Sequence, residues 1–427
     1  MPKRTEFASV SLDVGLGTEP KTARVVEEKV FRILLLGDFG GRGRQTKPVP
    51  IDRDNIDDVL AGLGVELALG GRIALRLRAM EDFHPDRIYR QVQAFQLLQA
   101  AEPEPKPKSP PRAPEPIVPA GGSLLDSIVD SMEPEPPAPQ ASEDELKAFV
   151  RKVVAPSLVP REDASVAERK ARADAAAGEL MRAILHHEAF QALEAAWRAV
   201  QFLVWRLETG EQLKLYLLDM PEAELSGAKL DDALRAMSWN LVAGNYTFGQ
   251  TGADVARLAR LAARMRGAGA AFVAEGVPGP AQGSAEWNAF RRLPEARVVG
   301  LALPRFLLRL PYGRESEPIE SFRFEEMPGA PAHQEYLWGN PAFALANLLG
   351  QEFRASEIDG LPLHVHKEGG ETRVKSCAEV QMTEEEMEWA LDQGYIPLVW
   401  LKDQGTVCVP RFQSIADPAT SLAGRWD

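Results

Sequence analysis

The sequence predicts an α/β fold, with mixed sheets and helices that flank them. Apolar runs of strand length alternate with helical segments along most of the chain. Within those segments the apolar spacing changes from two, which is typical of strands, to three and four, which is typical of helices. The 427 residues are enough for two or three domains around a substantial core.

The first predicted domain covers residues 1–101. Its apolar run KVFRILLLGDF indicates a buried strand, and RIALRLRAM alternates apolar residues with arginine, as a half-buried strand does. Two amphipathic segments indicate helices, and Pro85 suits the first turn of the second. In chain order, the expected elements are a strand at 29–39, a helix at 51–63, a strand at 72–80 and a helix at 84–100.

Proline-rich sequence follows at 102–121 and 134–143 and predicts an extended tether that cannot form a packed core. Between these stretches, residues 122–133 contain SLLDSIVDSM, whose apolar residues lie on one face of a helix. A helix this short is marginal alone. On pattern alone it is a docking peptide, the first piece of the next domain, or a nascent helix with no partner.

The second predicted domain covers residues 144–427. It opens with two helical patterns, at 143–159 and 165–208, and the latter is longer than a typical globular helix. Strands and helices alternate after that. The expected segments include QLKLYLLDM, WNLVAGNYTF, GADVARLARLAARMRG and VVGLALPRFLLRLPYG.

Charge and composition exclude several classes of function. With 49 Lys and Arg against 62 Asp and Glu, the formal charge is −13, which disfavours nucleic acid and anionic membranes as principal partners. No apolar run reaches the roughly 20 residues of a membrane span, and the start of the chain has no secretory signal. Cys377 and Cys408 suit a reducing compartment. We therefore expect a cytoplasmic protein without direct membrane insertion.

The glycines that follow the first strand raise the question of a phosphate site. The spacing after Gly37 puts Arg42 where a Walker loop needs glycine, and no Gly-Lys-Ser/Thr follows. The dinucleotide pattern G-x-G-x-x-G also fails, and Pro48 and Pro50 keep the chain extended where a helix should begin. The glycines are interpreted as a loop that leaves the end of a strand.

Histidines do not make a convincing metal site. His186 and His187 are neighbours on a predicted helix and point about 100° apart. His364 and His366 share one side of a strand, but no third ligand lies close in sequence. No metal and no cofactor are therefore predicted.

No catalytic set is indicated either. The nucleophile-elbow motif G-x-S-x-G is absent, and the pair Glu325–Glu326 is interpreted as solvated. Five tryptophans stand in apolar or amphipathic contexts and indicate core packing for the most part, with some as interface anchors: Trp197, Trp205, Trp338, Trp389 and Trp400.

Several long segments resemble the large subunit of the type VI secretion contractile sheath, in the order in which that family has them. They include ILHHEAFQALEAAWRAVQFLV, PRFLLRLPYG, YLWGNPAFALANLL and LDQGYIPLVWLKDQGTVCVPRFQSI. Independently, FRILLLGDFGGRGR, IDRDNIDDVL and MEDFHPDRIY resemble the small sheath subunit. The chain therefore resembles a natural fusion of the two subunits, outside the proline tether.

This resemblance implies an interwoven protomer fold and a structural function without a cofactor. Sheath protomers polymerise into a helical tube around an inner-tube protein, attach to baseplate proteins and contract to propel the inner tube. Strands added to a neighbour's sheet edge link the copies. On this view Gly37–Arg44 is a structural loop.

The resemblance also assigns candidate contact residues. The helix within 122–133 is similar to the segment that a Clp-family disassembly ATPase grips. Its expected contacts are Leu124, Leu125, Ile128 and Val129. The strongest motif supplies candidates for contacts between subunits or with the inner tube: Arg305, Arg309, Tyr312 and Arg314. The alternative for Arg305 and Arg309 is pairing with carboxylates inside the fold.

The chain departs from the family pattern in two places. The tether replaces the helices that continue the small subunit, and the stretch between LYLLDM and LDDALRAMSWN is short. Such losses remove contacts between protomers. Two alternatives therefore stay open beside the sheath protomer: a sheath-like accessory (a cap, a baseplate adaptor or a non-contractile scaffold), and an enzyme that uses the glycine loop.

Overall fold

A computed structural model describes residues 30–42, 44–70, 73–100, 166–280, 283–351, 355–402 and 404–426. The predicted tether with its short helix, residues 102–143, lies outside the described residues, as does the helix expected at 143–159.

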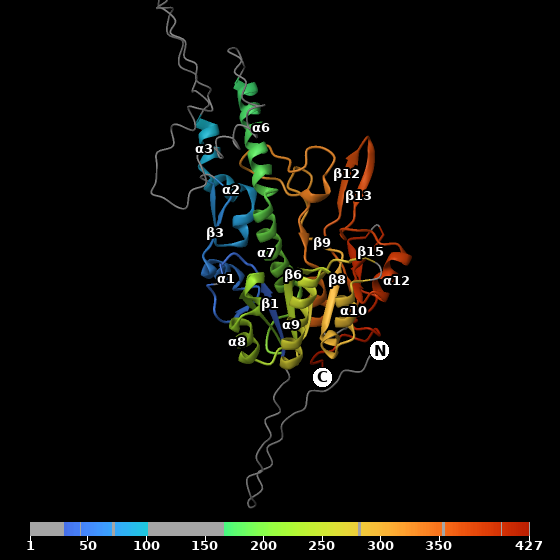
Figure 1. Cartoon of the computed structure of the whole chain (residues 1–427). Helices are drawn as coiled ribbons and strands as arrows, with labels where there is room; N and C mark the ends of the chain where they lie inside the picture. The colour runs from blue at the N-terminus through green and yellow to red at the C-terminus, as the bar shows by residue number, and fades with distance from the viewer. Residues whose placement is uncertain are drawn as a thin grey trace, which may run out of the picture.

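A seven-stranded sheet forms the centre of the structure, which confirms the α/β class (Figure 1). Its strand order is β14-β8-β7-β6-β1-β5-β2, and every neighbouring pair is parallel except β2 with β5. The strands are β1 (Phe31–Gly37), β2 (Val49–Ile51), β5 (Leu213–Asp219), β6 (Leu241–Phe248), β7 (Ala271–Gly276), β8 (Val299–Leu303) and β14 (Tyr395–Pro397).

Strand β1 comes from the N-terminal part but lies between two strands of the C-terminal part. It pairs with β5 over its whole length, from Phe31 opposite Leu213 to Gly37 opposite Asp219. Its other edge pairs with β6. Residues Ile33–Leu36 are fully buried, and they alternate between the two cores on either side of the sheet. The strand expected at 29–39 is therefore confirmed, and the two parts of the chain share one sheet.

Helices cover both faces of this sheet. One core contains residues of α1 (Ile56–Leu63), α6 (Val166–Leu185), α7 (Glu188–Arg206) and α11 (Pro341–Gly350). The core on the opposite face contains residues of α8 (Ala228–Ala236), α9 (Gly252–Ala268), α10 (Ala285–Arg291) and α12 (Glu384–Asp392). Helix α11 is buried nearly all round, so the first face is covered by more than one layer.

The N-terminal part contains the remaining predicted elements, with two differences. The helix expected at 51–63 is α1, which begins only at Ile56 because Ile51 ends β2. The alternating strand is β4 (Ala74–Leu77), which pairs with β3 (Val65–Ala68). The helix expected at 84–100 is instead two helices, α2 (Pro85–Gln91) and α3 (Gln93–Ala100). The buried Val92 lies between them with φ −90° and ψ 110°, outside the helical region, and its β-branched side chain accepts that conformation easily.

The single helix predicted over 165–208 is wrong, because the chain turns between α6 and α7. His187 is the N-cap of α7: its backbone is extended, and its Nδ1 accepts a hydrogen bond from the N–H of Ala189 at 3.2 Å. The break contains no proline or glycine that would indicate it in the sequence. A histidine caps the second helix instead.

Short elements complete the fold. The small sheets are β9 (Phe306–Leu307) with β10 (Trp338–Gly339), β11 (Glu357–Ile358) with β16 (Thr406–Cys408) and β15 (Val399–Leu401), and the hairpin β12 (His364–Glu368) with β13 (Glu371–Lys375). The 3-10 helices are η1 (Met80–Phe83), η3 (Glu222–Ser226), η4 (Pro294–Val298) and η5 (His333–Glu335).

The shared sheet predicts that the tether is not needed to hold the two parts together. A protease site inserted after Pro110 allows the chain to be cut, and we expect both fragments to elute together in gel filtration. Separation would expose the four fully buried residues of β1 and break its hydrogen bonds on both edges. Fragments that elute apart in native buffer contradict this expectation; elution in urea provides the control for complete cutting.

Candidate functional site

A second contact between the two parts lies at α2. Asp86 accepts hydrogen bonds from the backbone N–H groups of Glu320, at 3.0 and 3.1 Å, and of Ser321, at 2.8 Å. Burial alone raises the pKa of Asp86, but these hydrogen bonds outweigh it and the pKa is lowered. Asp86 thus stays ionised and fastens the loop around residue 320 to the N-terminal part.

Aromatic rings extend this contact. Tyr89 stacks on Phe322 with ring centroids 5.2 Å apart, and Phe322 in turn packs on Phe324 at 5.5 Å. His84 meets the ring of Tyr312 edge-on at 5.1 Å. Helix α2 therefore holds the 312–324 loop by both hydrogen bonds and ring packing.

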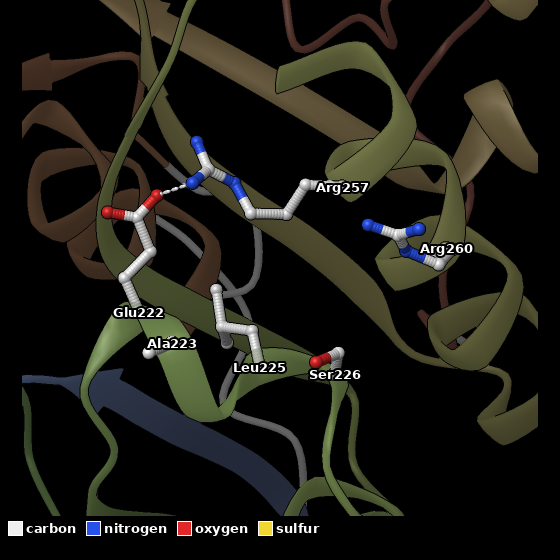
Figure 2. Close-up of a pocket in the computed structure, with 6 residues that line it drawn as sticks. All are labelled: Glu222, Ala223, Leu225, Ser226, Arg257 and Arg260. Carbon is white, nitrogen blue, oxygen red and sulfur yellow. Dashed lines mark ion pairs between the residues drawn. The ribbon is translucent and has the colours of Figure 1, made fainter. Parts of the chain in front are cut away.

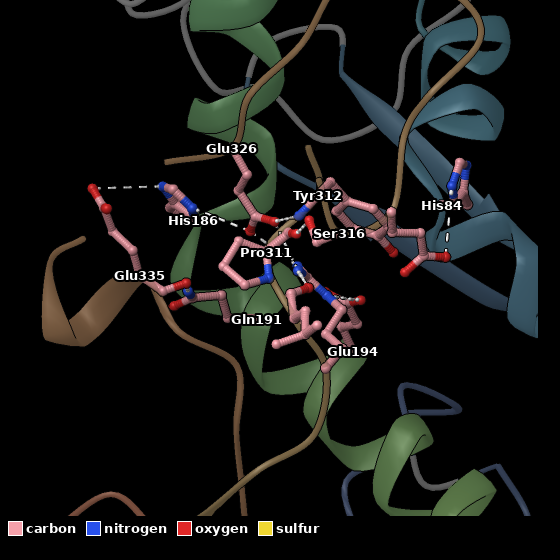
Figure 3. Close-up of polar contacts among 12 residues, drawn as sticks. His84, His186, Gln191, Glu194, Pro311, Tyr312, Ser316, Glu326 and Glu335 are labelled. Atoms are coloured by element: carbon pink, nitrogen blue, oxygen red, sulfur yellow. Dashed lines mark hydrogen bonds and ion pairs between the residues drawn. The ribbon is translucent and has the colours of Figure 1, made fainter. Parts of the chain in front are cut away.

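A buried charge cluster lies directly behind that loop (Figure 3). Arg309 bridges two carboxylates: its Nε is 2.8 Å from Glu194 on α7, and its Nη1 is 2.8 Å from Glu326. The side chains of both glutamates are fully buried and that of Arg309 is 7% exposed. Two carboxylates balance the desolvated guanidinium, and the planar fork of arginine suits both of them.

Three further side chains satisfy the rest of the cluster. Arg198, one turn after Glu194 on α7, bonds to that carboxylate at 2.7 Å and donates to the hydroxyl of Tyr312 at 2.8 Å. His186, at the turn between α6 and α7, lies 3.3 Å from Glu326. Burial raises the pKa of the Tyr312 hydroxyl, so it stays neutral. The cluster ties α7 to the 309–326 loop, and that loop is the segment that α2 holds.

The structure corrects one sequence interpretation. Glu325 is exposed, as expected, but Glu326 is buried and belongs to the charge cluster. The solvated pair predicted at Glu325–Glu326 is therefore wrong for its second member. The buried Arg309 requires a carboxylate here, and Glu326 continues the alternation that buries Phe322 and Phe324 and exposes Glu325.

The four candidate contact residues divide by location. Arg309 and Tyr312 are buried within the chain. Arg305 makes a double contact with Glu379, at 2.8 and 2.5 Å, and Arg314 is exposed. Internal carboxylate pairing, the alternative left open for Arg305 and Arg309, is thus present for both.

Three residues of these contacts escaped sequence reasoning: Glu194 and Arg198 of the charge cluster, and Asp86 of the contact at α2. Glu194 had a signal that was available: it is an acidic residue on the apolar face of α7, between Phe190 and Trp197. A charge in such a position indicates a buried partner. Asp86 gave no signal, because an aspartate in the first turn of a helix is ordinary.

The glycine loop after β1 surrounds a carboxylate. Asp219 at the end of β5 accepts the backbone N–H of Phe39 at 2.7 Å, and both residues are fully buried. A Cβ on Gly41 would lie 2.9 Å from the same carboxylate. Gly40 has φ +82°, a conformation that favours glycine. A protein carboxylate thus fills the space in which a bound phosphate would need to lie.

The histidine pairs take structural positions. His186 and His187 serve the charge cluster and the helix cap. His364 and His366 stack at 5.2 Å, and Nδ1 of His364 lies 2.7 Å from the Tyr336 hydroxyl. Among the described residues, no three His, Cys, Asp or Glu side chains are grouped to hold a metal ion.

A surface pocket of about 360 Å³ lies between η3 and α9 (Figure 2). Arg257 points across it toward Glu222, with which it forms an ion pair, and its other neighbour is Asp254 at 2.6 Å. The guanidinium is therefore already neutralised, and the six lining residues include neither histidine nor cysteine.

Removal of Arg309 is expected to destabilise the fold strongly. Arg309→Met leaves two buried carboxylates without their shared partner, which costs about 3–5 kcal/mol of the free energy of unfolding. Urea denaturation measures this change. Arg314→Met, at the exposed end of the same motif, is the matched control and changes stability by less than about 0.5 kcal/mol. Equal effects of the two variants would contradict a role for the cluster.

Acid is expected to weaken the same cluster. Burial raises the pKa of Glu326, but Arg309, His186 and the N–H of Tyr312 outweigh burial and lower it to about 2, against an ordinary value of 4.5. The unfolded chain therefore takes up the proton first, so this stabilisation is complete above about pH 5 and is lost as the pH falls toward about 2.

Urea denaturation between pH 5 and pH 3 measures this loss. We expect a shallower decline of the free energy of unfolding in Glu326→Gln than in the unsubstituted protein. Glu325→Gln, which changes the exposed neighbour, keeps the full decline. An identical slope in all three proteins would count against the assignment.

In the part of the chain that the structure describes, no helix has the length and the apolar character to cross a membrane.

Comparison with known proteins identifies two sheath families in this one chain. Residues 168–254 and 280–416, more than half of the chain, match the family described as EvpB/VC_A0108, tail sheath N-terminal domain. Residues 12–103 match the family described as Type VI secretion system, VipA, VC_A0107 or Hcp2. The type VI secretion system sheath protein TssC1 of Pseudomonas aeruginosa is 27% identical over 55% of this chain, and the match spans 58% of that relative.

The two matches meet in space where β1 of the first enters the sheet of the second. The chain belongs to the type VI secretion sheath family and joins a small-subunit part and a large-subunit part in one polypeptide.

Proposed function

We propose that this chain is a structural protomer of a contractile sheath. Copies polymerise into a helical tube around an inner-tube protein, and the tube shortens to propel it. The observation that supports the proposal is the presence of both sheath families in one chain whose strands interlock in a single sheet. The energy for contraction is the difference in free energy between two packings of the same subunits, so no cofactor is needed.

The buried contacts between the N-terminal and C-terminal parts of the chain suit a protein that transmits force. Strand β1 is hydrogen-bonded on both edges, and the Arg309 cluster fixes α7 to the loop that α2 holds. A protomer that is rigid inside changes shape least when it is pulled. Contraction then takes place as movement between copies rather than within them.

The hairpin β12–β13 supports a strand-exchange contact between copies. Its two strands form a sheet by themselves, and its cross-strand pair Val365 and Val374 is exposed. Two strands make a marginal sheet in water, and unpaired strand edges accept further strands. We assign this hairpin as the place where a neighbouring copy adds a strand.

The remaining assignments complete the proposal. Partners are the inner-tube protein, baseplate proteins and a Clp-family ATPase, and the compartment is the cytoplasm. Leu124, Leu125, Ile128 and Val129 form the ATPase contact. Of the four candidates in the strongest motif, Arg314 and Arg305 are accessible to a neighbouring copy, whereas Arg309 and Tyr312 act by holding the loop in place.

A sheath-like accessory is the less favoured alternative. The relative that matches this chain is itself named a sheath protein, and both family matches are to sheath components. No feature of the described residues favours a cap, an adaptor or a static scaffold over a sheath protomer.

Electron microscopy of the expressed protein tests the proposal. We expect long hollow tubes, in an extended and a shortened form when the inner-tube protein is supplied. Val365→Asp should prevent tube formation, because it puts a charge into the strand contact, while the free energy of unfolding stays unchanged. Leu293→Asp changes a similarly exposed side chain elsewhere and should leave the tubes intact.

Two outcomes of the same experiment contradict the proposal. One is a protein that stays in small species under all conditions, and the other is a single tube form that never shortens. Tubes made with Ile128→Glu test the ATPase contact: they should form normally but resist disassembly by a Clp-family ATPase. Disassembly at the normal rate contradicts that assignment.

A further inference from the structure

The glycine loop after β1 carries three basic side chains that its packing around Asp219 does not explain. Arg42, Arg44 and Lys47 are all exposed, and among the described residues none of the three forms an ion pair. The backbone of Arg42 has φ 54°, in the left-handed region that residues other than glycine rarely adopt. Strained backbone of this kind clusters at functional sites. We call these three residues the basic loop.

The carboxylates beside the basic loop do not balance its charge. Glu66 accepts a hydrogen bond from Arg42 at 3.4 Å through its backbone oxygen, but its carboxylate pairs with Arg76 at 3.1 Å. Asp38 is exposed and accepts the N–H of Gly40 at 3.0 Å, so it offsets one of the three charges at most. In a chain whose formal charge is −13, this local excess of positive charge indicates an acidic partner.

Helix α12 has the opposite charge. Its nine residues include no basic residue and five carboxylates, all of them exposed: Glu384, Glu385, Glu386, Glu388 and Asp392. Glu386 bonds to Thr383 at the N-cap, and in the described part of the chain none of the five forms an ion pair. This helix therefore has unneutralised negative charge on its surface.

An exposed tryptophan lies among these carboxylates. Trp389 is 37% exposed, and Glu385, Glu386 and Asp392 are four and three residues before it and three after it, on the same side of the helix. Trp389 and Glu386 also line a groove of about 310 Å³ with Val380, which is 51% exposed. An arginine suits this side of α12, because its guanidinium stacks on an indole ring and pairs with carboxylates.

The basic loop and α12 lie on opposite sides of the central sheet. Gln45 fixes the loop to β5, since its side chain donates to the backbone oxygen of Leu217 at 3.1 Å and accepts from the N–H of Asp219 at 2.6 Å. Helix α12 leads into β14, an outer strand of the sheet. Five strand intervals separate β5 from β14, or about 24 Å.

Figure 1 shows the same separation: α1, which follows the outer strand β2, is at the left of the view and α12 is at the right. A lysine or arginine side chain does not span this distance. The basic loop therefore meets an α12 helix only if that helix belongs to another copy.

We propose that the basic loop of one copy binds the side of α12 that carries Trp389 on a second copy. The inference rests on the proposed assembly, because it names a contact between protomers. Its two surfaces differ and lie on opposite sides of the molecule, so the contact repeats from copy to copy and generates an open helical polymer. Exposed ion pairs contribute little binding energy singly, but matched charges of this kind fix the register of the neighbour.

Zero-length cross-linking of the full-length protein tests this contact. A carbodiimide joins a lysine amine directly to a carboxylate, with loss of water. Isotope-labelled copies are mixed with unlabelled ones before coupling, and we expect mixed-isotope peptides that join Lys47 to residues 384–392. Lys47→Arg keeps the charge but cannot be coupled, so it should abolish these peptides while assembly stays intact.

Charge reversal provides the second measurement. The loop variant, Arg42→Glu with Arg44→Glu, and the helix variant, Glu385→Lys with Asp392→Lys, should each lower the cross-link yield about tenfold when alone, because like charges then face each other. An equimolar mixture of the two should restore the links from Lys47 of the helix variant to α12 of the loop variant. Arg76→Glu with Arg235→Glu, at arginines 70% and 71% exposed, changes the net charge equally and should leave the yield unchanged.

Three results overturn the inference: links that never mix isotopes, links from Lys47 to another surface only, and a yield that the mixture does not restore. An equal loss in the control pair overturns it as well, because the effect would then follow net charge alone. Electron microscopy of the same samples separates the inference from the proposed function. Tubes without these links refute the inference alone, and the links without tubes refute the sheath proposal alone.

Discussion

Strand β1 is the element on which the rest of the structure depends. It belongs to the N-terminal part, yet its hydrogen-bond partners on both edges are strands of the C-terminal part. A strand in the middle of a parallel sheet is buried on both faces, so Ile33–Leu36 read as one continuous apolar run. Without β1 the sheet would split between β5 and β6, and each part would expose a full row of backbone groups. Neither part of the chain therefore completes its core alone.

The charge cluster around Arg309 determines how the two parts of the chain fit together. Hydrophobic burial holds the sheet together but does not fix where an irregular loop lies. Arg309 fixes the position of the loop, because a buried guanidinium is stable only where both Glu194 and Glu326 pair with it. The loop placed in this way presents the N–H groups of Glu320 and Ser321 to Asp86 on α2. One cluster thus positions the second joint between the two parts.

The charged groups of this molecule are paired in its interior, and the features that can contact another copy lie on its surface. The charged groups that resemble a reactive site are paired internally, as in the carboxylate of Asp219 within the glycine loop. The strand edges of the hairpin β12–β13 lie on the outside, where they can accept a further strand. A sheath protomer needs this division, because its interior must stay fixed while its surfaces exchange partners.

The sequence by itself determined the fold class, the buried strand β1, the amphipathic helices and the family, since these depend on local periodicity or on long motifs. It did not determine the turn at His187, which depends on a histidine cap, or the partner of the buried Glu326, which is Arg309. Arg309 and Glu194 are 115 residues apart, so only the tertiary structure could bring the pair together. Periodicity records which face of an element is buried. Periodicity does not show which distant charged residue pairs with a buried one. In this chain the packing of the elements determines those pairs.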